Sequence, residues 1–506
     1  MFKLIVVSVF VFGCAAFSPN VNAQTKKSAV RQNDKNKSPD KKSAQDKSKK
    51  PTKAELAKQA EAARQQQAAQ EARRQAALEA QQRREQAARE ARQRQLNFER
   101  GLKDETLENI ARDNTDGEDL EVRRAAVNAL QGHAGTIVVL EPQTGKVLSI
   151  VNQDWAIRKG FKPCSTIKLV TATAGINEKV IDESGNIETR RFPMELNDAL
   201  AFSNNSYFQT VGSTGLGNTK MITYARALGL GEPTGINAEN ESVGKLPYGN
   251  NNARIYSHGD DFEVTPLQLA TLVSAISNGG KLLVPQIPHT GFQKTDFRVQ
   301  YKRGINVAPA TLQEILPGMV GAVNYGTARR SGAGAFAAAG KTGSCIGQGS
   351  WLGLFASVAP VANPQIAVVV VTRGAGERGK YAAAIAGKVY QALAPRLRRE
   401  NGGREIIAKV PAELKPHPRV DAKKSASVDT DAGEDSDEGD VNPAAAKFAN
   451  SKRLNPKKGG DDAETNVERG GTPSPKNSVK PAMLFPSTII QVKRENSRPR
   501  IVPMNN

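Results

Sequence analysis

The stretch Phe161-Lys-Pro-Cys-Ser-Thr-Ile-Lys-Leu-Val170 decides how the rest of the chain is interpreted. It places a hydroxyl at Ser165 and an amine at Lys168, three residues further on. Residues at this spacing share one face of a helix, so the amine can take the proton of the hydroxyl. The same spacing occurs at Ser38-Pro-Asp-Lys41, inside a lysine-rich stretch, so the pair alone decides nothing. The surrounding sequence has to supply the context.

Residues 133–397 have the aliphatic density, glycine turns and periodicity that a packed core requires. Near the start of this block, two β-rich runs flank Pro142-Gln-Thr-Gly145, which is typical of a hairpin with the glycine at a positive φ. A helix is expected to begin at about Ser165, where unpaired N–H groups and the helix dipole favour an anion. The expected strands are residues 135–141, 146–152, 339–345, 351–358 and 365–372.

Helices fill the interval between the first two strands and the last three. Residues 196–206 indicate a helix, a polar break and a second helix. A buried helix over residues 265–276 is favoured by Thr265 as cap and Pro266 at its first position, and Asn278-Gly-Gly280 stops it. A last helix is expected over residues 381–397. This order predicts an α+β fold, in which a central five-stranded antiparallel sheet is flanked by helices and the first and last strands share one sheet.

Three polar clusters then occur in a fixed order: Ser165-Thr-Ile-Lys168, Ser203-Asn-Asn205 and Lys341-Thr-Gly343. Together they resemble the signature of the penicillin-binding protein and serine β-lactamase superfamily, which combines S-x-x-K, an S-D-N-like triplet and K-T-G. The resemblance covers residues 135–395. It implies a transpeptidase-like fold and an acyl-enzyme mechanism that uses no metal and no other cofactor.

The resemblance assigns a chemical role to each cluster. Ser165 is the nucleophile, and Lys168, desolvated next to another cation, is its base. Ser203 relays a proton to the leaving amine, and Asn205 binds the substrate backbone. Lys341 keeps its charge and attracts the substrate carboxylate. The same strand is expected to supply the substrate-binding residues Thr342, Gly343 and Ser344, and the N–H groups of Ser165 and Ser344 are expected to form the oxyanion hole.

Each of these residues also has a purely structural interpretation. Ser203 can serve as a helix cap, and Lys341 as an edge-strand lysine that discourages aggregation. Each of these structural interpretations can explain one residue taken by itself. They do not explain three clusters that occur in the order of a known signature.

Two cysteines outside the first 23 residues, Cys164 and Cys345, flank the elements that the family's mechanism brings together. If Ser165 and Ser344 both aim an N–H at one oxygen, their neighbouring Cα atoms fall within disulfide range. Some carbapenem-hydrolysing class A β-lactamases have a disulfide at the same motif-relative positions. We therefore expect a Cys164–Cys345 disulfide, the alternative being two small buried thiols.

The N-terminal segment 1–23 has the features of a signal peptide. Lys3 is followed by an apolar run, and Val21-Asn-Ala23 is a small-residue cleavage site. Two alternatives remain, namely an uncleaved anchor and lipidation at Cys14. All three direct the chain to the periplasm or cell envelope, where disulfides persist.

The flanks of the core are of low complexity. Residues 24–51 are basic and are expected to be disordered, as is the tail 398–506, which has one apolar island at residues 482–492. Residues 52–101 are rich in Ala, Gln and Arg and favour a long helix, either solvated or weakly self-associating as a coiled coil. The partner expected for this segment is a second copy of the chain or another protein of the envelope. Residues 102–132 are expected to form a helical connector. The formal net charge is +20, and much of the Lys and Arg excess lies in these flanks, so the charge indicates no specific nucleic acid as partner.

Three functions fit this sequence. The first is a D,D-transpeptidase or carboxypeptidase that acts on D-Ala-D-Ala peptidoglycan stem peptides and is acylated by β-lactams at Ser165. The second is a β-lactamase, which requires a deacylating water; Glu239 and Glu241 are the carboxylates available for it, in a loop that otherwise resembles transpeptidases. The third is a β-lactam or peptidoglycan sensor that is acylated once and signals through its helix and tails.

Overall fold

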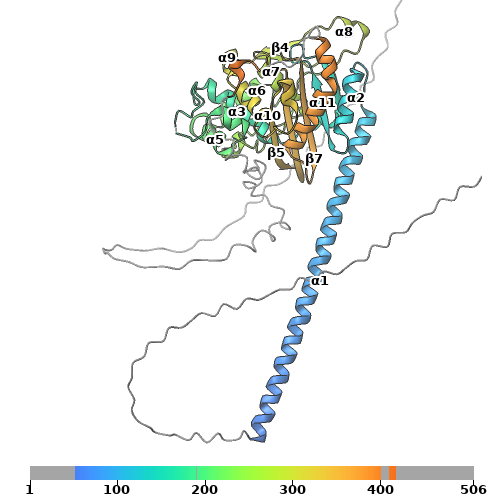
Figure 1. Ribbon diagram of the computed structural model, residues 1–506, viewed down its shortest axis with the longest axis vertical. Helices are drawn as coiled ribbons and strands as arrows, with labels where there is room; N and C mark the ends of the chain where they lie inside the picture. Colours follow the sequence, from blue (N-terminus) through green and yellow to red (C-terminus); the bar gives the residue numbers. More distant parts are fainter. Residues whose placement is uncertain (1–51, 190, 401–409, 417–506) are drawn as a thin grey trace, which may run out of the picture. The chain divides into compact units, whose positions relative to one another are not determined.

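The computed structural model describes residues 52–189, 191–400 and 410–416 (Figure 1). The expected signal peptide, the basic segment 24–51 and most of the expected tail lie outside these ranges. The described residues fall into two compact units that are divided after Gly101. Within the described ranges, no helix combines the length and apolar character that a bilayer span requires.

The first unit consists of the greater part of one helix, α1 (Lys53–Arg112). Its side chains up to Gly101 are almost all exposed, including Leu56 and Leu78. We expected this helix to end at residue 101, but it continues to Arg112. Glycine inside a helix costs only about 1 kcal/mol, and beyond Gly101 the helix buries Leu102, Thr106 and Asn109.

The second unit contains the remaining elements. Its helices are α2 (Leu120–Leu130), α3 (Lys168–Asn177), α4 (Leu196–Ala201), α5 (Asn205–Val211), α6 (Gly217–Ala227), α7 (Pro266–Ser277), α8 (Gly291–Thr295), α9 (Pro309–Gln313), α10 (Leu316–Asn324) and α11 (Gly379–Glu400). Single turns are η1 (Asp154–Arg158), η2 (Cys164–Ile167), η3 (Gly212–Leu216), η4 (Ala253–Tyr256), η5 (Ala333–Phe336) and η6 (Ala412–Leu414). Its strands are β1 (Ala134–Leu140), β2 (Val147–Val151), β3 (Lys281–Leu283), β4 (Tyr301–Gly304), β5 (Ala339–Gly347), β6 (Ser350–Ala359) and β7 (Ile366–Gly374).

Five strands form one antiparallel sheet in the order β2-β1-β7-β6-β5. The first and last strands in the chain, β1 and β7, are neighbours in it, with Val138 opposite Val369. Gly145 adopts a φ of 75° in the β1–β2 hairpin. The prediction of an α+β fold with a five-stranded antiparallel sheet is therefore confirmed.

The sheet is buried on both faces, which explains why β7 begins with a continuous apolar run from Ile366 to Val371. Successive side chains of β7 point into two different cores. Val369 packs in the core that includes α3 and α7, and Val370 packs in the core that includes α2 and α11. Figure 1 shows α2 and α11 on one side of the sheet and α3, α5 and α6 on the other. Helix α7 begins with the expected cap at Thr265, which forms a reciprocal capping box with Gln268.

Two further expectations require correction. The stretch that carries Ser165 does not enter an α-helix directly: η2 is a 3-10 turn, and α3 begins only at Lys168. In addition, the chain after residue 397 is not disordered throughout. Helix α11 extends to Glu400. Further on, Leu414 is buried in the core, and Val410 packs against the same core.

Candidate active site

The turn η2 carries Ser165, the expected nucleophile, and is called the nucleophile turn below. It departs from ordinary helix geometry at its first residue. Pro163 precedes it and has no N–H, and Cys164 adopts a left-handed φ of 48°. Side chains three residues apart nearly eclipse each other in a 3-10 turn. Lys168 Nζ consequently donates to Ser165 Oγ over 2.8 Å. Only 1% of Ser165 is exposed, so this pair is largely removed from water.

Lys168 is fully buried and is surrounded by neutral acceptors. Besides Ser165 Oγ, its Nζ donates to Ser203 O (2.6 Å), Ser203 Oγ (2.9 Å) and Asn205 Oδ1 (2.6 Å). The first two polar clusters of the sequence therefore converge on one nitrogen. An amine held in this way beside a serine hydroxyl can serve as its base.

Ser203 lies in the break between α4 and α5, with a left-handed φ of 58°. Ser203 does not cap α5. Its neighbour Asn204 does, because Asn204 Oδ1 accepts the N–H of Tyr207 over 2.8 Å. Ser203 Oγ instead accepts from Lys168 on one side and from Lys341 Nζ, at 2.8 Å, on the other. One hydroxyl thus connects two amines.

Lys341 lies on the edge strand β5 but is fully buried, which is unlike a lysine that protects a sheet edge. Its Nζ also donates to Thr342 O over 3.0 Å. Thr342 Oγ1 donates to Thr327 Oγ1 over 2.6 Å, and Ser344 Oγ accepts the N–H of Gly379 over 2.9 Å. Positive charge and hydroxyls therefore gather where β5 meets Ser203.

Strand β5 lies directly against the nucleophile turn. The Cα atoms of Cys164 and Cys345 are 5.6 Å apart, and the two sulfurs are bonded to each other. A Cβ added to Gly343 would lie 3.2 Å from both Cys164 Cβ and Pro163 O, so only glycine fits this approach without displacement. The site predicted from the sequence is thus brought together, and the oxyanion role of the Ser165 and Ser344 N–H groups stays a prediction.

Sequence reasoning missed several residues around this cluster. Thr327 precedes β5 and contacts Thr342, and the buried residues Ser257 and His258 lie in a loop after η4. The chain offers only a weak local signal for them, because their roles depend on contacts across long sequence separations. Glu241, one of the two carboxylates that could activate a deacylating water, has both oxygens bonded within its own turn, to Thr234 and the N–H of Gly235.

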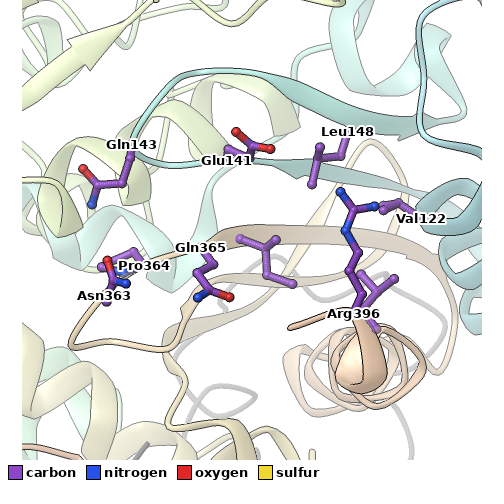
Figure 2. Close-up of a pocket in the computed structure, with 10 residues that line it drawn as sticks. Val122, Glu141, Gln143, Leu148, Asn363, Pro364, Gln365 and Arg396 are labelled. Atoms are coloured by element: carbon purple, nitrogen blue, oxygen red, sulfur yellow. The ribbon is translucent and has the colours of Figure 1, made fainter. Parts of the chain in front are cut away.

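A cavity of about 310 Å³ lies elsewhere in the domain. Figure 2 shows Glu141 and Gln143 on the hairpin side and Arg396 reaching across from α11. Four apolar residues that line it belong to the core that contains α2 and α11, namely Val122, Leu148, Ile366 and Leu393. The cavity shares no residue with the Ser165 cluster, so it is separate from the candidate active site.

The comparison with known families agrees with this geometry. Residues 135–391 match the family described as penicillin binding protein transpeptidase domain. The match spans half of the chain, and the protein therefore belongs to this family. The resemblance inferred from the three clusters is confirmed.

Similar proteins include the peptidoglycan D,D-transpeptidase MrdA of Haemophilus influenzae, which is 25% identical over 358 residues, or 54% of each chain. Stage V sporulation protein D of Bacillus subtilis is 25% identical over 287 residues, covering 49% of this chain and 44% of the relative. This chain spans about half the length of these relatives. Among solved structures, Pseudomonas aeruginosa PBP2 in complex with WCK 5153 aligns with a TM-score of 0.48 and 24% identity, covering 55% of this chain and 78% of that chain.

Proposed function

We propose that this protein is an exported penicillin-binding D,D-transpeptidase that acts on peptidoglycan stem peptides ending in D-Ala-D-Ala. The observation that carries the proposal is the hydrogen-bonded series Ser165 Oγ, Lys168 Nζ, Ser203 Oγ and Lys341 Nζ, with successive distances of 2.8, 2.9 and 2.8 Å. It joins a nucleophile, a base, a proton relay and a cation within one buried cluster. Family membership and the transpeptidase relatives support the same assignment.

Acylation would begin when the uncharged amine of Lys168 takes the Ser165 proton. Two amines share Ser203 Oγ, and like charges this close disfavour the doubly protonated state. Ser165 Oγ then attacks the carbonyl of the penultimate D-Ala, and the N–H groups of Ser165 and Ser344 would stabilise the oxyanion. Losing one such donor typically costs about 3 to 4 kcal/mol in the transition state.

Collapse of the tetrahedral intermediate breaks the peptide bond and leaves a Ser165 ester. The proton held by Lys168 passes through Ser203 Oγ to the amine of the departing D-Ala. Lys341 and Thr342, with Thr327 beside it, would hold the carboxylate of the terminal residue. An acceptor amine that attacks the ester yields a cross-link, and water yields carboxypeptidase activity. A β-lactam would acylate Ser165 by the same route.

The state of Glu241 supports a transpeptidase over a β-lactamase. Its two carboxylate oxygens already accept hydrogen bonds from Thr234 and Gly235, so they stabilise a turn. We further propose that the Cys164–Cys345 disulfide forms after export and fixes β5 against the nucleophile turn. Self-association, or contact with another protein of the envelope, would use the exposed part of α1, residues 53–101.

A stem pentapeptide and a fluorescent penicillin test the assignment together. We expect release of D-Ala from the pentapeptide and persistent labelling by the penicillin, and we expect Ser165→Ala to abolish both. Ser38→Ala is the matched control, because Ser38 has the same spacing to a lysine and should leave both activities unchanged. Rapid hydrolysis of the penicillin would instead indicate a β-lactamase. Labelling without D-Ala release would indicate a sensor.

A further inference from the structure

The segment Glu377-Arg378-Gly379 leads from β7 into α11 and takes no part in the acylation steps of the proposed function. His133 Nδ1 lies 2.8 Å from Glu377 Oε1, and only 14% of the Glu377 side chain is exposed. The second carboxylate oxygen of Glu377, Oε2, is buried and has no hydrogen-bond partner among the described residues. The carboxylate of Glu377 therefore depends on His133 for its hydrogen bond.

His133 is itself fixed to the sheet. It directly precedes β1, and its backbone N–H donates to Leu130 O over 3.0 Å. The first residue of β1, Ala134, is paired with Arg373 near the end of β7. The His133–Glu377 pair thus joins the start of β1 to the segment that follows β7, and it anchors this segment to the sheet.

The other end of the segment contacts the strand that is expected to carry half of the oxyanion hole. The N–H of Gly379, the first residue of α11, donates to Ser344 Oγ over 2.9 Å. The first N–H groups of a helix have no partner within the helix, so this donor is available to the strand. A Cβ added to Gly353 would lie 2.5 Å from Arg378 O, and Gly353 is paired with Ser344. Residues 377–379 therefore lie directly on the sheet at Ser344.

Strand β5 is held from both faces at this point. A Cβ added to Gly379 would lie 2.8 Å from Thr342 Cβ and 2.9 Å from Gly343 O. Thr342 and Ser344 point to one face of the strand and Gly343 faces Cys164 on the other, because successive residues of a strand alternate. The nucleophile turn thus contacts one face of β5, and the start of α11 contacts the other. Together these contacts set how close Ser344 lies to the nucleophile turn.

A second contact holds the same segment. The guanidinium of Arg378 lies 3.2 Å from the centroid of the Trp351 ring on β6, which is a cation–π contact. Loss of the His133–Glu377 pair would therefore displace the segment only in part. The expected loss of activity is smaller than the loss that follows removal of a whole oxyanion donor.

We propose that His133 and Glu377 are positioning residues for acylation, which hold the start of α11 against Ser344 and thereby keep the Ser344 N–H at its place in the oxyanion hole. This inference rests on the proposed function, in which the N–H groups of Ser165 and Ser344 stabilise the oxyanion. Neither His133 nor Glu377 has to touch the substrate. Because the oxyanion exists only after attack by Ser165, the pair should act on the rate constant of acylation and not on the affinity of the non-covalent complex.

The test is acylation by fluorescent penicillin on the full chain, measured as a function of penicillin concentration. This measurement separates the Kd of the non-covalent complex from the rate constant of acylation. We expect His133→Ala to lower the rate constant about tenfold and to leave Kd unchanged, because complete loss of an oxyanion donor costs about 10²–10³-fold and the Arg378 contact remains. His133→Asn keeps an N–H near the Nδ1 position and should acylate faster than His133→Ala.

Three further variants keep the test decisive. Glu377→Ala should match His133→Ala, and the double variant should be no slower than either one, because both remove the same contact. Ser344→Ala removes the acceptor of the Gly379 N–H and should lower the same rate constant, which provides the result if the variants of the pair do not fold. His289→Ala is the matched control, since it removes a partly exposed histidine 3.4 Å from Asp116 and should change neither quantity.

Several outcomes would overturn the inference. They are an unchanged rate constant in His133→Ala and Glu377→Ala, a loss that appears only in Kd, a double variant whose loss is the product of the two single losses, or a His133→Asn variant no faster than His133→Ala. An unchanged rate constant in Ser344→Ala would overturn it as well. A wild-type chain that the penicillin does not label would instead overturn the proposed function.

Discussion

Lys341 Nζ donates to Ser203 Oγ over 2.8 Å, although 138 residues separate the two in the chain. The same oxygen accepts from Lys168 at 2.9 Å, so a single hydroxyl lies between an amine on α3 and an amine on β5. In the proposed mechanism, this arrangement would provide a short path for a proton to leave Lys168 after Ser165 is activated. The buried position of both lysines keeps that path separate from bulk water.

Removing this hydroxyl should slow acylation without unfolding the domain. We expect Ser203→Ala to lower the rate of penicillin acylation by roughly 10²-fold, which is typical for the loss of a proton-transfer group. Stopped-flow fluorescence with labelled penicillin measures the rate. Asn204→Ala is the matched control, because it removes the cap of α5 and should cost about 1 kcal/mol in the free energy of unfolding. Equal acylation rates in the two variants would contradict a relay through Ser203.

The close approach of β5 to the nucleophile turn should tolerate no side chain at Gly343. An added Cβ would lie 3.2 Å from Cys164 Cβ and from Pro163 O, both of which belong to the segment that carries Ser165. We expect Gly343→Ala to reduce acylation by about tenfold or more through displacement of β5. Gly376→Ala is the control, since that position has open space. Unchanged labelling in Gly343→Ala would show that the strand and turn are not held at this distance.

The Cys164–Cys345 pair joins the same two elements covalently. The sequence separation is 181 residues, and removal of a native disulfide typically costs about 2 to 5 kcal/mol. We expect the double variant Cys164→Ser, Cys345→Ser to unfold at lower denaturant concentration and to acylate more slowly. A reducing agent should reproduce both effects in the wild type and have none in the variant. Two free thiols in the unreduced wild type would disprove the bridge.

His258 should make the folded state sensitive to acid. Burial, followed by the charges of Lys168 and Arg254, lowers its pKa to about 3 in the folded state, whereas an unfolded histidine titrates near 6.5. Between these values the unfolded chain binds the extra proton, so stability falls as the pH falls. From pH 7 to pH 5 this contributes a loss of about 2 kcal/mol. Denaturant unfolding at both pH values should show a smaller loss in His258→Gln; an equal loss would contradict this.

The sequence was sufficient to predict the sheet and the residues that lie together in the buried cluster of Ser165, Lys168, Ser203 and Lys341, whose chemical roles stay predictions. Three clusters of unusual side chains keep their order, and alternating or continuous apolar runs mark the strands. Local chemistry also predicted the start of α7, because Thr265, Pro266 and Gln268 satisfy the first turn by themselves.

Features that depend on tertiary contacts could not be predicted. The 3-10 turn at Ser165 begins at Cys164, which has a left-handed backbone and is packed against β5. The spacing of apolar residues in the sequence does not predict such packing. Thr327 and His258 acquire their surroundings from segments far away in the chain. The extension of α1 past Gly101 depends on the burial of one face of its last turns, which local propensity underestimates.

The most direct test of the central claim is to locate the adduct that benzylpenicillin forms with the protein. Intact mass spectrometry should show one penicilloyl group per chain, and fragmentation of the proteolytic peptides should place it on Ser165. Absence of an adduct under conditions in which the chain is folded, or an adduct on any residue other than Ser165, would contradict the account.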